Sequence, residues 1–357
     1  MRLPKTVNKY RSAIFMLAGS IAFAAYLWFI VGVSSLFDLF SQLDLGKYSL
    51  YYSIAILALF MSVFFDSMIW HSLLQSMKVK MKLRKIVLYN WIGNFVEMVI
   101  PCETVCGEVT RMYLAKKDTN QNIGATAAPV ITSRLLSTLV YTSGLLVGSL
   151  VLVTTQRMPT YLLGTLLLVS VASIGTIFAA LYLVLKEEAA EKLVSLAMVF
   201  VKIVTKSKAA QEQRRENLRL SLYSFGEAFG TYKKRPKFLI KPIFYAVIAW
   251  SFTLLVYMMV FYSLDFMSIS IVDLAMVYCV SSIVETLTAG FPVGAVEITM
   301  ISLYSALGIP LVVAGAATTL TRLLTFWFQI IVGYPIFQIT GLENLLKVGL
   351  SESLLGT

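Results

Sequence analysis

The sequence predicts an all-helical, polytopic membrane protein with about six full spans and two re-entrant helical hairpins, arranged as inverted-topology repeats. Of its 357 residues, 58% are hydrophobic and only 14% are charged, whereas about 25% of the residues of a soluble domain are charged. Lys and Arg number 30 against 19 Asp and Glu, a bias typical of basic cytoplasmic loops. This composition excludes a soluble enzyme, a disordered chain and a nucleic-acid-binding domain.

The predicted spans follow from length. A helix that crosses a bilayer needs about 20 mostly apolar residues. Six stretches meet this rule: 13–36, 48–74, 123–152, 160–185, 239–263 and 311–338. The stretches 86–115 and 270–308 are also apolar, but each is interrupted by a proline beside polar residues, Pro101 in IPCETVCGE and Pro292 in GFPVGAVE. We expect these two stretches to form the hairpins, with Pro101, Gly107, Pro292 and Gly294 breaking their helices.

The loop charges predict the orientation of the spans. The loop 78–85 carries five basic residues and the segment 186–241 carries thirteen, whereas the loop 264–273 has two aspartates and no base. Basic loops lie on the cytoplasmic side. The stretch 86–115 must then enter the membrane from the cytoplasm and return to the cytoplasm, and 270–308 must enter from outside and return to the outside. Both termini are then cytoplasmic. The alternative is that each broken stretch is a kinked or interfacial helix.

An internal repeat supports two hairpins of opposite orientation. GEVTRMYL at 107–114 aligns with VEITMISL at 296–303, so that Glu108 matches Glu297. An Arg-Leu-Leu sequence follows each, at Arg134 and Arg322, 26 and 25 residues after the glutamates. Broken segments in corresponding positions of two halves are typical of secondary transporters, in which the binding site lies at the repeat interface.

The predicted organisation has five parts. Residues 1–47 form an N-terminal span, and 48–152 form the first repeat of span, hairpin and span. Residues 153–238 contain a span and a basic, amphipathic cytoplasmic segment. The second, inverted repeat covers 239–338, and 339–357 form a cytoplasmic tail.

Charged residues within the apolar stretches are the candidate site. A charge at the bilayer centre costs about 2.5–3.5 kcal/mol or more, and such residues usually pair or face a cavity. The candidates for substrate binding are Asp66, Glu108, Arg111, Arg134, Glu285, Glu297 and Arg322, and Glu97 is a further charge of this kind. The repeat predicts that Glu108 pairs with Arg134 and Glu297 with Arg322. Such pairs could be structural supports, or the arginines could bind a phosphate headgroup.

Signals for metal or cofactor chemistry are weak. Cys102 and Cys106 are four residues apart, but the chain has a single histidine, which gives few ligands for zinc. Neither a P-loop nor a G-x-G-x-x-G sequence occurs, so nucleotide binding has no support. We therefore expect no metal, no cofactor and no enzyme activity.

Several sequence blocks carry a family resemblance. NWIGNFVEMVIPCETVCGEVTR at 90–111, TSRLL around Arg134, FPVGAVE at 291–297, LGIP at 307–310 and TRLL around Arg322 follow in order. Together they resemble the integral-membrane region of lysylphosphatidylglycerol synthase/flippase proteins and their stand-alone bacterial and archaeal relatives. The second block has fewer glycines than is usual there, and we see no aminoacyl-transferring domain, so synthase activity is not expected.

The resemblance implies a flippase in a prokaryotic plasma membrane. Such a protein moves a polar lipid or a lipid-linked sugar between leaflets, and its partners are lipids with an anionic or polyprenyl-phosphate-linked headgroup. Two alternatives stay open. One is an intramembrane enzyme that acts on a lipid headgroup, and the other is a non-catalytic partner of a glycosyltransferase or synthase.

Overall fold

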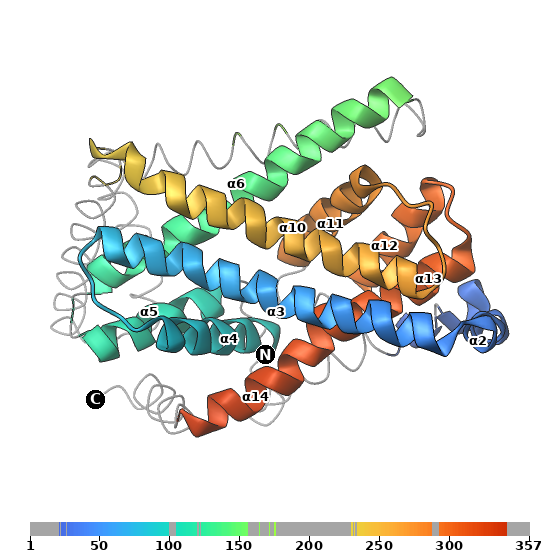
Figure 1. Cartoon of the computed structure of the whole chain (residues 1–357), viewed down its shortest axis with the longest axis horizontal. Helices are drawn as coiled ribbons and strands as arrows, with labels where there is room; N and C mark the ends of the chain where they lie inside the picture. The colour runs from blue at the N-terminus through green and yellow to red at the C-terminus, as the bar shows by residue number, and fades with distance from the viewer. Residues whose placement is uncertain are drawn as a thin grey trace, which may run out of the picture.

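The structure, a computed structural model, describes residues 21–99, 105–155 and 235–340, apart from 22, 26, 120, 122 and 288–292. It also describes the single positions 164, 171, 175, 230, 232 and 234. Over these residues every regular element is a helix (Figure 1). Apart from those single positions, the predicted span 160–185 and the basic segment 186–234 lie outside the described residues, as does the tail 341–357.

Four of the predicted spans are confirmed as long apolar helices. The first is α3 (Leu45–Ser76), which begins where the Asp44 carboxylate accepts hydrogen bonds from the backbone N–H groups of Gly46 and Lys47 at 2.8 and 3.4 Å. The others are α6 (Ile123–Thr155), α10 (Ile240–Ser263) and a continuous rod of α13 (Leu311–Arg322), the π-helical turn η3 (Leu323–Phe328) and α14 (Gln329–Ile339). A short 3-10 turn, η2 (Pro236–Leu239), leads into α10.

The structure departs from the prediction in the first span, 13–36. In its described part, the π-helical turn η1 (Leu27–Gly32) is followed by α2 (Val33–Gln42), and the helix axes before and after this break differ by 82°. Gly32 has φ +86°, a left-handed conformation that glycine adopts without steric cost. The chain therefore turns sharply at Gly32, and the second helix runs six residues past the predicted end of the span.

Both interrupted stretches are pairs of short helices. The first pair is α4 (Leu83–Val99) with α5 (Val105–Thr119), and the second is α11 (Ile271–Leu287) with α12 (Ala295–Ala306). The helices of each pair pack on one another, and each has at most 17 residues, which is short for a span. Residues 100–104 separate the helices of the first pair and 288–294 those of the second, and Pro101 and Pro292 fall outside the described residues.

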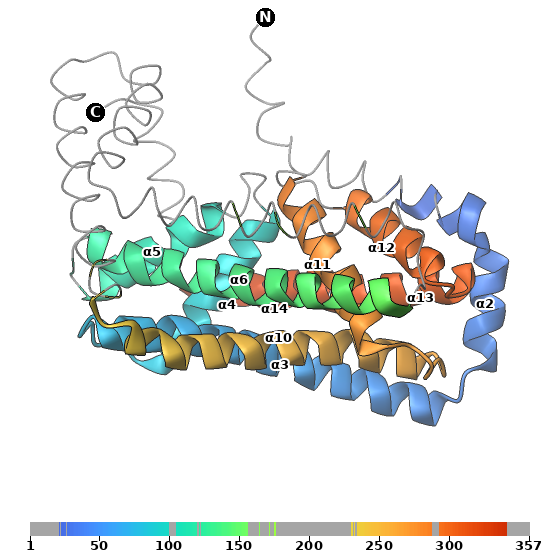
Figure 2. The same ribbon diagram turned by 90° about the horizontal axis from the view of Figure 1, so that it is seen from above.

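The central feature of the fold is the antiparallel pair α3 and α10, which lie side by side in both views (Figures 1 and 2). The α4–α5 pair lies near the end of α3, and the α11–α12 pair lies towards the opposite end of the molecule. Each pair also packs on the other half of the chain: α4 contacts α14, and α11 contacts α6. The space enclosed by these helices therefore lies between the two halves.

Close packing of α14 on α4 depends on a glycine. A Cβ atom at Gly333 would lie 2.6 Å from the Cβ of Phe95, whereas one at Gly148 of α6 would lie 3.7 Å from its nearest neighbour. Alanine is favoured over glycine in a helix by about 1 kcal/mol, but overpacking costs about 1–3 kcal/mol. We expect Gly333→Ala to lower the melting temperature in detergent and Gly148→Ala to leave it unchanged or raise it. Equal melting temperatures would contradict this packing.

Candidate functional site

Two glutamate–arginine pairs occupy matching places in the two halves. Arg134 Nη2 of α6 donates to Glu97 Oε1 of α4 at 3.3 Å. Arg322 Nη1 of α13 donates to Glu285 Oε1 of α11 at 3.2 Å. The partners are 37 residues apart in both pairs. Each glutamate lies two residues before the end of the first hairpin helix, so the same contact joins each hairpin to the helix that follows it.

The second half adds a deeply buried carboxylate. Glu297 of α12 is only 2% exposed, and its Oε1 accepts a hydrogen bond from Arg322 Nε at 2.7 Å. Its Oε2 accepts one from the backbone N–H of Gly294 at 2.6 Å. Gly294 has φ +92° and is the N-cap of α12, so this glycine lies between the two helices of the pair. The predicted contact between Glu297 and Arg322 is present, and it also caps α12.

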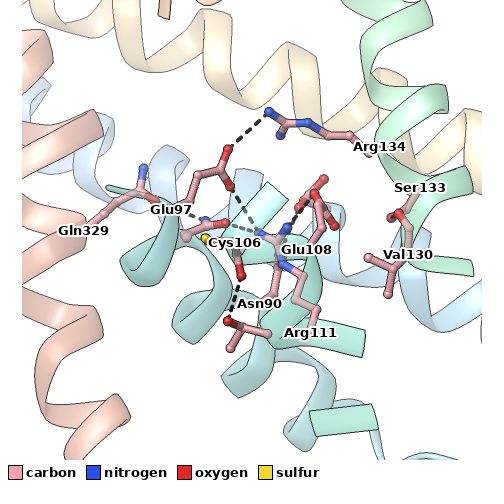
Figure 3. Close-up of polar contacts among 12 residues, drawn as sticks. Asn90, Glu97, Cys106, Glu108, Arg111, Val130, Ser133, Arg134 and Gln329 are labelled. Atoms are coloured by element: carbon pink, nitrogen blue, oxygen red, sulfur yellow. Dashed lines mark hydrogen bonds and ion pairs between the residues drawn. The ribbon is translucent and has the colours of Figure 1, made fainter. Parts of the chain in front are cut away.

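In the first half, the predicted pairing of Glu108 with Arg134 is wrong. Glu108 Oε1 accepts instead from Arg111 Nη1 at 2.8 Å, one turn further along α5 (Figure 3). Arg111 Nη2 also donates to Asn94 Oδ1 and lies 4.0 Å from Glu97 Oε2. Side chains three residues apart share a helix face. Arg111 therefore pairs with Glu108 within α5, and Arg134 pairs instead with Glu97.

Gly107 is not a helix breaker, because it lies inside α5. A Cβ at this position would lie 2.7 Å from the backbone oxygen of Gly93, and a Cβ at Gly93 would lie 2.4 Å from Arg111 Nε. The two glycines therefore let α4 and α5 approach closely, and they leave room for the Arg111 side chain between the helices.

Asp66 belongs to α3 and is held by neutral donors. Its Oδ2 accepts from Asn90 Nδ2 at 3.0 Å, and its Oδ1 accepts from Ser137 Oγ at 3.5 Å. Asn90 also donates to Ser67 Oγ at 3.0 Å. The carboxylate thus joins α3 to α4 and α6, next to the Arg134 side chain.

A cavity of about 290 Å³ brings the two halves of the site together. Its charged lining residues are Asp66, Glu97, Arg134, Glu285 and Arg322. Glu108 and Arg111 line a neighbouring cavity of about 20 Å³, which shares Asp66 and Arg134 with the larger one. Glu297 contacts Arg322 but lines neither cavity.

Sequence reasoning missed two features of this cavity. Glu97 was named as a buried charge, but its pairing with Arg134 was not predicted; the shared separation of 37 residues in Glu97–Arg134 and Glu285–Arg322 is a signal that could have found it. The second missed part is an aromatic wall, which consists of Tyr141, Trp250, Tyr257, Tyr278 and Phe326. Within the part of the chain that the structure describes, no group of three or more His, Cys, Asp or Glu side chains could hold a metal ion.

Long apolar helices around a cavity with a charged lining define a helical integral membrane protein with a polar internal site. The family model of the lysylphosphatidylglycerol synthase TM region matches residues 15–333, and the chain belongs to this family. It is 25% identical over 290 residues to a UPF0104 membrane protein of Pyrococcus horikoshii, covering 78% of this chain and 84% of the relative. It is 22% identical over 321 residues to one of Methanothermobacter thermautotrophicus, covering 89% and 92%.

Proposed function

We propose that the protein is a flippase that moves a polar lipid, or a lipid-linked headgroup, between the leaflets of a prokaryotic plasma membrane. The observation that carries this proposal is the shared cavity. Arg134 and Arg322 come from matching positions in the two halves, and both line the same cavity of about 290 Å³. Binding at a repeat interface, on broken helices, is the arrangement that secondary transporters use.

The packing of the helices supports an inverted repeat of α3–α6 and α10–α14. The first helices of the two units, α3 and α10, run antiparallel (Figure 1). Each hairpin then packs on the last span of the other unit, α4 on α14 and α11 on α6. Contacts of this reciprocal kind are expected when a two-fold axis relates two units. In this proposal, small movements of one unit against the other open the cavity to either side.

The site chemistry fits passage of a headgroup. Arg134 has a side chain that is 43% exposed, and among the described residues it makes one ion pair, with Glu97, so its guanidinium still has donors for a headgroup oxygen. Glu97 and Glu285 keep the two arginines paired when the cavity is empty. The apolar tails stay in the lipid while the headgroup crosses between the hairpins, which needs no chemical turnover.

The orientation in this proposal follows from the loops. The basic residues of 78–85 lie in the connection from α3 to α4 and in the first turn of α4, whereas Asp265 lies in the loop after α10. Basic residues favour the cytoplasmic side. The α4–α5 hairpin therefore enters from the cytoplasm, the α11–α12 hairpin enters from outside, and both termini are cytoplasmic.

Filling the cavity tests the proposal. Ser137 and Ser143 both lie on α6, but only Ser137 lines the cavity, and Ser143 is exposed. We expect vesicles that contain the parent protein to translocate lipids with fluorescent tails, scored by dithionite quenching. Ser137→Trp should lower the rate at least about tenfold because the indole occupies the headgroup space, while Ser143→Trp keeps the parental rate. Equal rates for the two variants, or no translocation by the parent, would contradict the proposal.

A further inference from the structure

Three buried polar atoms at the cavity have no hydrogen-bond partner among the described residues. They are Arg322 Nη2, Trp250 Nε1 and Ser281 Oγ, and all three residues line the cavity. Ser281 is 3% exposed and Arg322 is 6% exposed. Buried donors of this kind are costly to leave unpaired. Arg and Trp can only donate, so a ligand that satisfies them must present acceptor atoms, such as the oxygens of hydroxyl groups.

The charges of the cavity disfavour an anion as that ligand. Three carboxylates and two guanidinium groups line it, so its wall is net negative when all are ionised. The carboxylate of Glu285 and the carboxylate of Glu297 each contact Arg322 already. A phosphate that approached this arginine would face like charges at short range, where screening by solvent is weak. Carboxylates instead accept hydrogen bonds from hydroxyl groups.

Part of the cavity lining is aromatic. The Tyr257 and Tyr278 rings meet edge to face, with centroids 5.7 Å apart, and Tyr141 packs on Tyr278 at 6.2 Å. Trp250 adds a fourth ring. Small-molecule sites commonly combine aromatic walls with a few polar groups, in volumes from about 300 Å³ upwards. The cavity volume of about 290 Å³ therefore suits one small group with both an apolar face and several hydroxyls.

We infer that the cavity selects an uncharged, hydroxyl-rich headgroup, of which a single sugar is the simplest example. The unpartnered donors of Ser281, Trp250 and Arg322 bind its oxygens, the carboxylates accept from its hydroxyls, and the aromatic rings cover its apolar face. This inference names the substrate class of the site in the proposed function and rests on that function for the role of the lipid tails.

Binding to the full chain in detergent tests the selectivity. The ligands are a glucosyl diacylglycerol with two hexanoyl chains, a phosphatidic acid with the same chains, and methyl glucoside. The affinity of each is measured by calorimetric titration. We expect the glucosyl lipid to bind at least about tenfold more tightly than phosphatidic acid, as expected where a phosphate meets like charges. Methyl glucoside should bind more weakly than the glucosyl lipid because it lacks the tails. Equal or tighter binding of phosphatidic acid would overturn the inferred class.

Two variants test the donors themselves. Ser281→Ala and Trp250→Phe each remove an atom that has no hydrogen bond in the structure. Ser281→Ala should leave the melting temperature unchanged, whereas Trp250→Phe should lower it because the indole ring also packs against Gly144. We expect each to weaken binding of the glucosyl lipid about fivefold, the size of one hydrogen bond, and to leave phosphatidic acid unaffected. Thr132→Ala is the matched control, because its hydroxyl is also buried and unpartnered but lies outside the cavity.

The outcomes separate this inference from the proposed function. Parental affinity of Ser281→Ala for the glucosyl lipid would overturn the role of the donors, whatever the translocation assay shows. A protein that binds the glucosyl lipid with these effects but translocates no lipid would support the sugar site and contradict the flippase proposal. Methyl glucoside that binds as tightly as the glucosyl lipid would support the site but identify a free sugar as its ligand.

Discussion

Replacing Glu297 by alanine is expected to lower the free energy of unfolding by about 3–5 kcal/mol, the usual cost of removing one partner of a buried ion pair. Glu297 is almost completely buried, and it accepts hydrogen bonds from Arg322 Nε and from the backbone N–H of Gly294. Its loss leaves a buried guanidinium short of a partner and uncaps α12. Equilibrium unfolding in mixed micelles, followed by circular dichroism, measures the change.

Glu285→Ala is the matched control, because Glu285 contacts the same guanidinium. Its side chain is 42% exposed and its contact with Arg322 is longer, at 3.2 Å, and ion pairs of exposed groups contribute about 0–1 kcal/mol. We therefore expect Glu285→Ala to cost less than about 1 kcal/mol. Similar losses for the two variants would show that Glu297 is not the main support of Arg322.

Length and polarity alone located much of the fold. The spans now seen as α3, α6 and α10 were predictable because each is an apolar run longer than a bilayer requires. The two hairpins were predictable because proline and polar residues interrupt their apolar runs. The bend at Gly32 was not, since a glycine within an apolar run gives no signal of its φ angle before the fold is known.

The residues of the site were easier to predict from the sequence than the contacts between them. Charges inside apolar stretches stand out from the sequence because burying them is costly. Their pairing depends on helix geometry: aligning the two sequence segments matched Glu108 with Arg134, whereas Arg111, on the same helix face as Glu108, is its partner in the structure. Glu97 supplies the contact that Glu285 makes in the other half. The aromatic wall gave no signal, because tyrosine and tryptophan are common throughout this apolar chain.

Replacing Arg134 by glutamine is expected to slow lipid translocation at least about tenfold, because a hydrogen bond from a charged donor contributes about 1.5–3 kcal/mol. The side chain is 43% exposed and makes a single ion pair, at 3.3 Å, within the part of the chain that the structure describes, so the free energy of unfolding should change by less than about 1 kcal/mol. Glutamine keeps a donor at this position but loses the charge and the fork of the guanidinium.

The control for Arg134→Gln is Lys85→Gln, which also removes one basic partner from an ion pair, with Asp118 at 2.8 Å, but lies outside the cavity lining. Both variants lose one positive charge, so a general effect of charge on reconstitution would slow them equally. We expect only Arg134→Gln to lose translocation, at equal amounts of reconstituted protein. If Arg134→Gln instead keeps the parental rate, the guanidinium is a structural partner of Glu97, and headgroup binding must rest on Arg322 and the unpartnered donors around it.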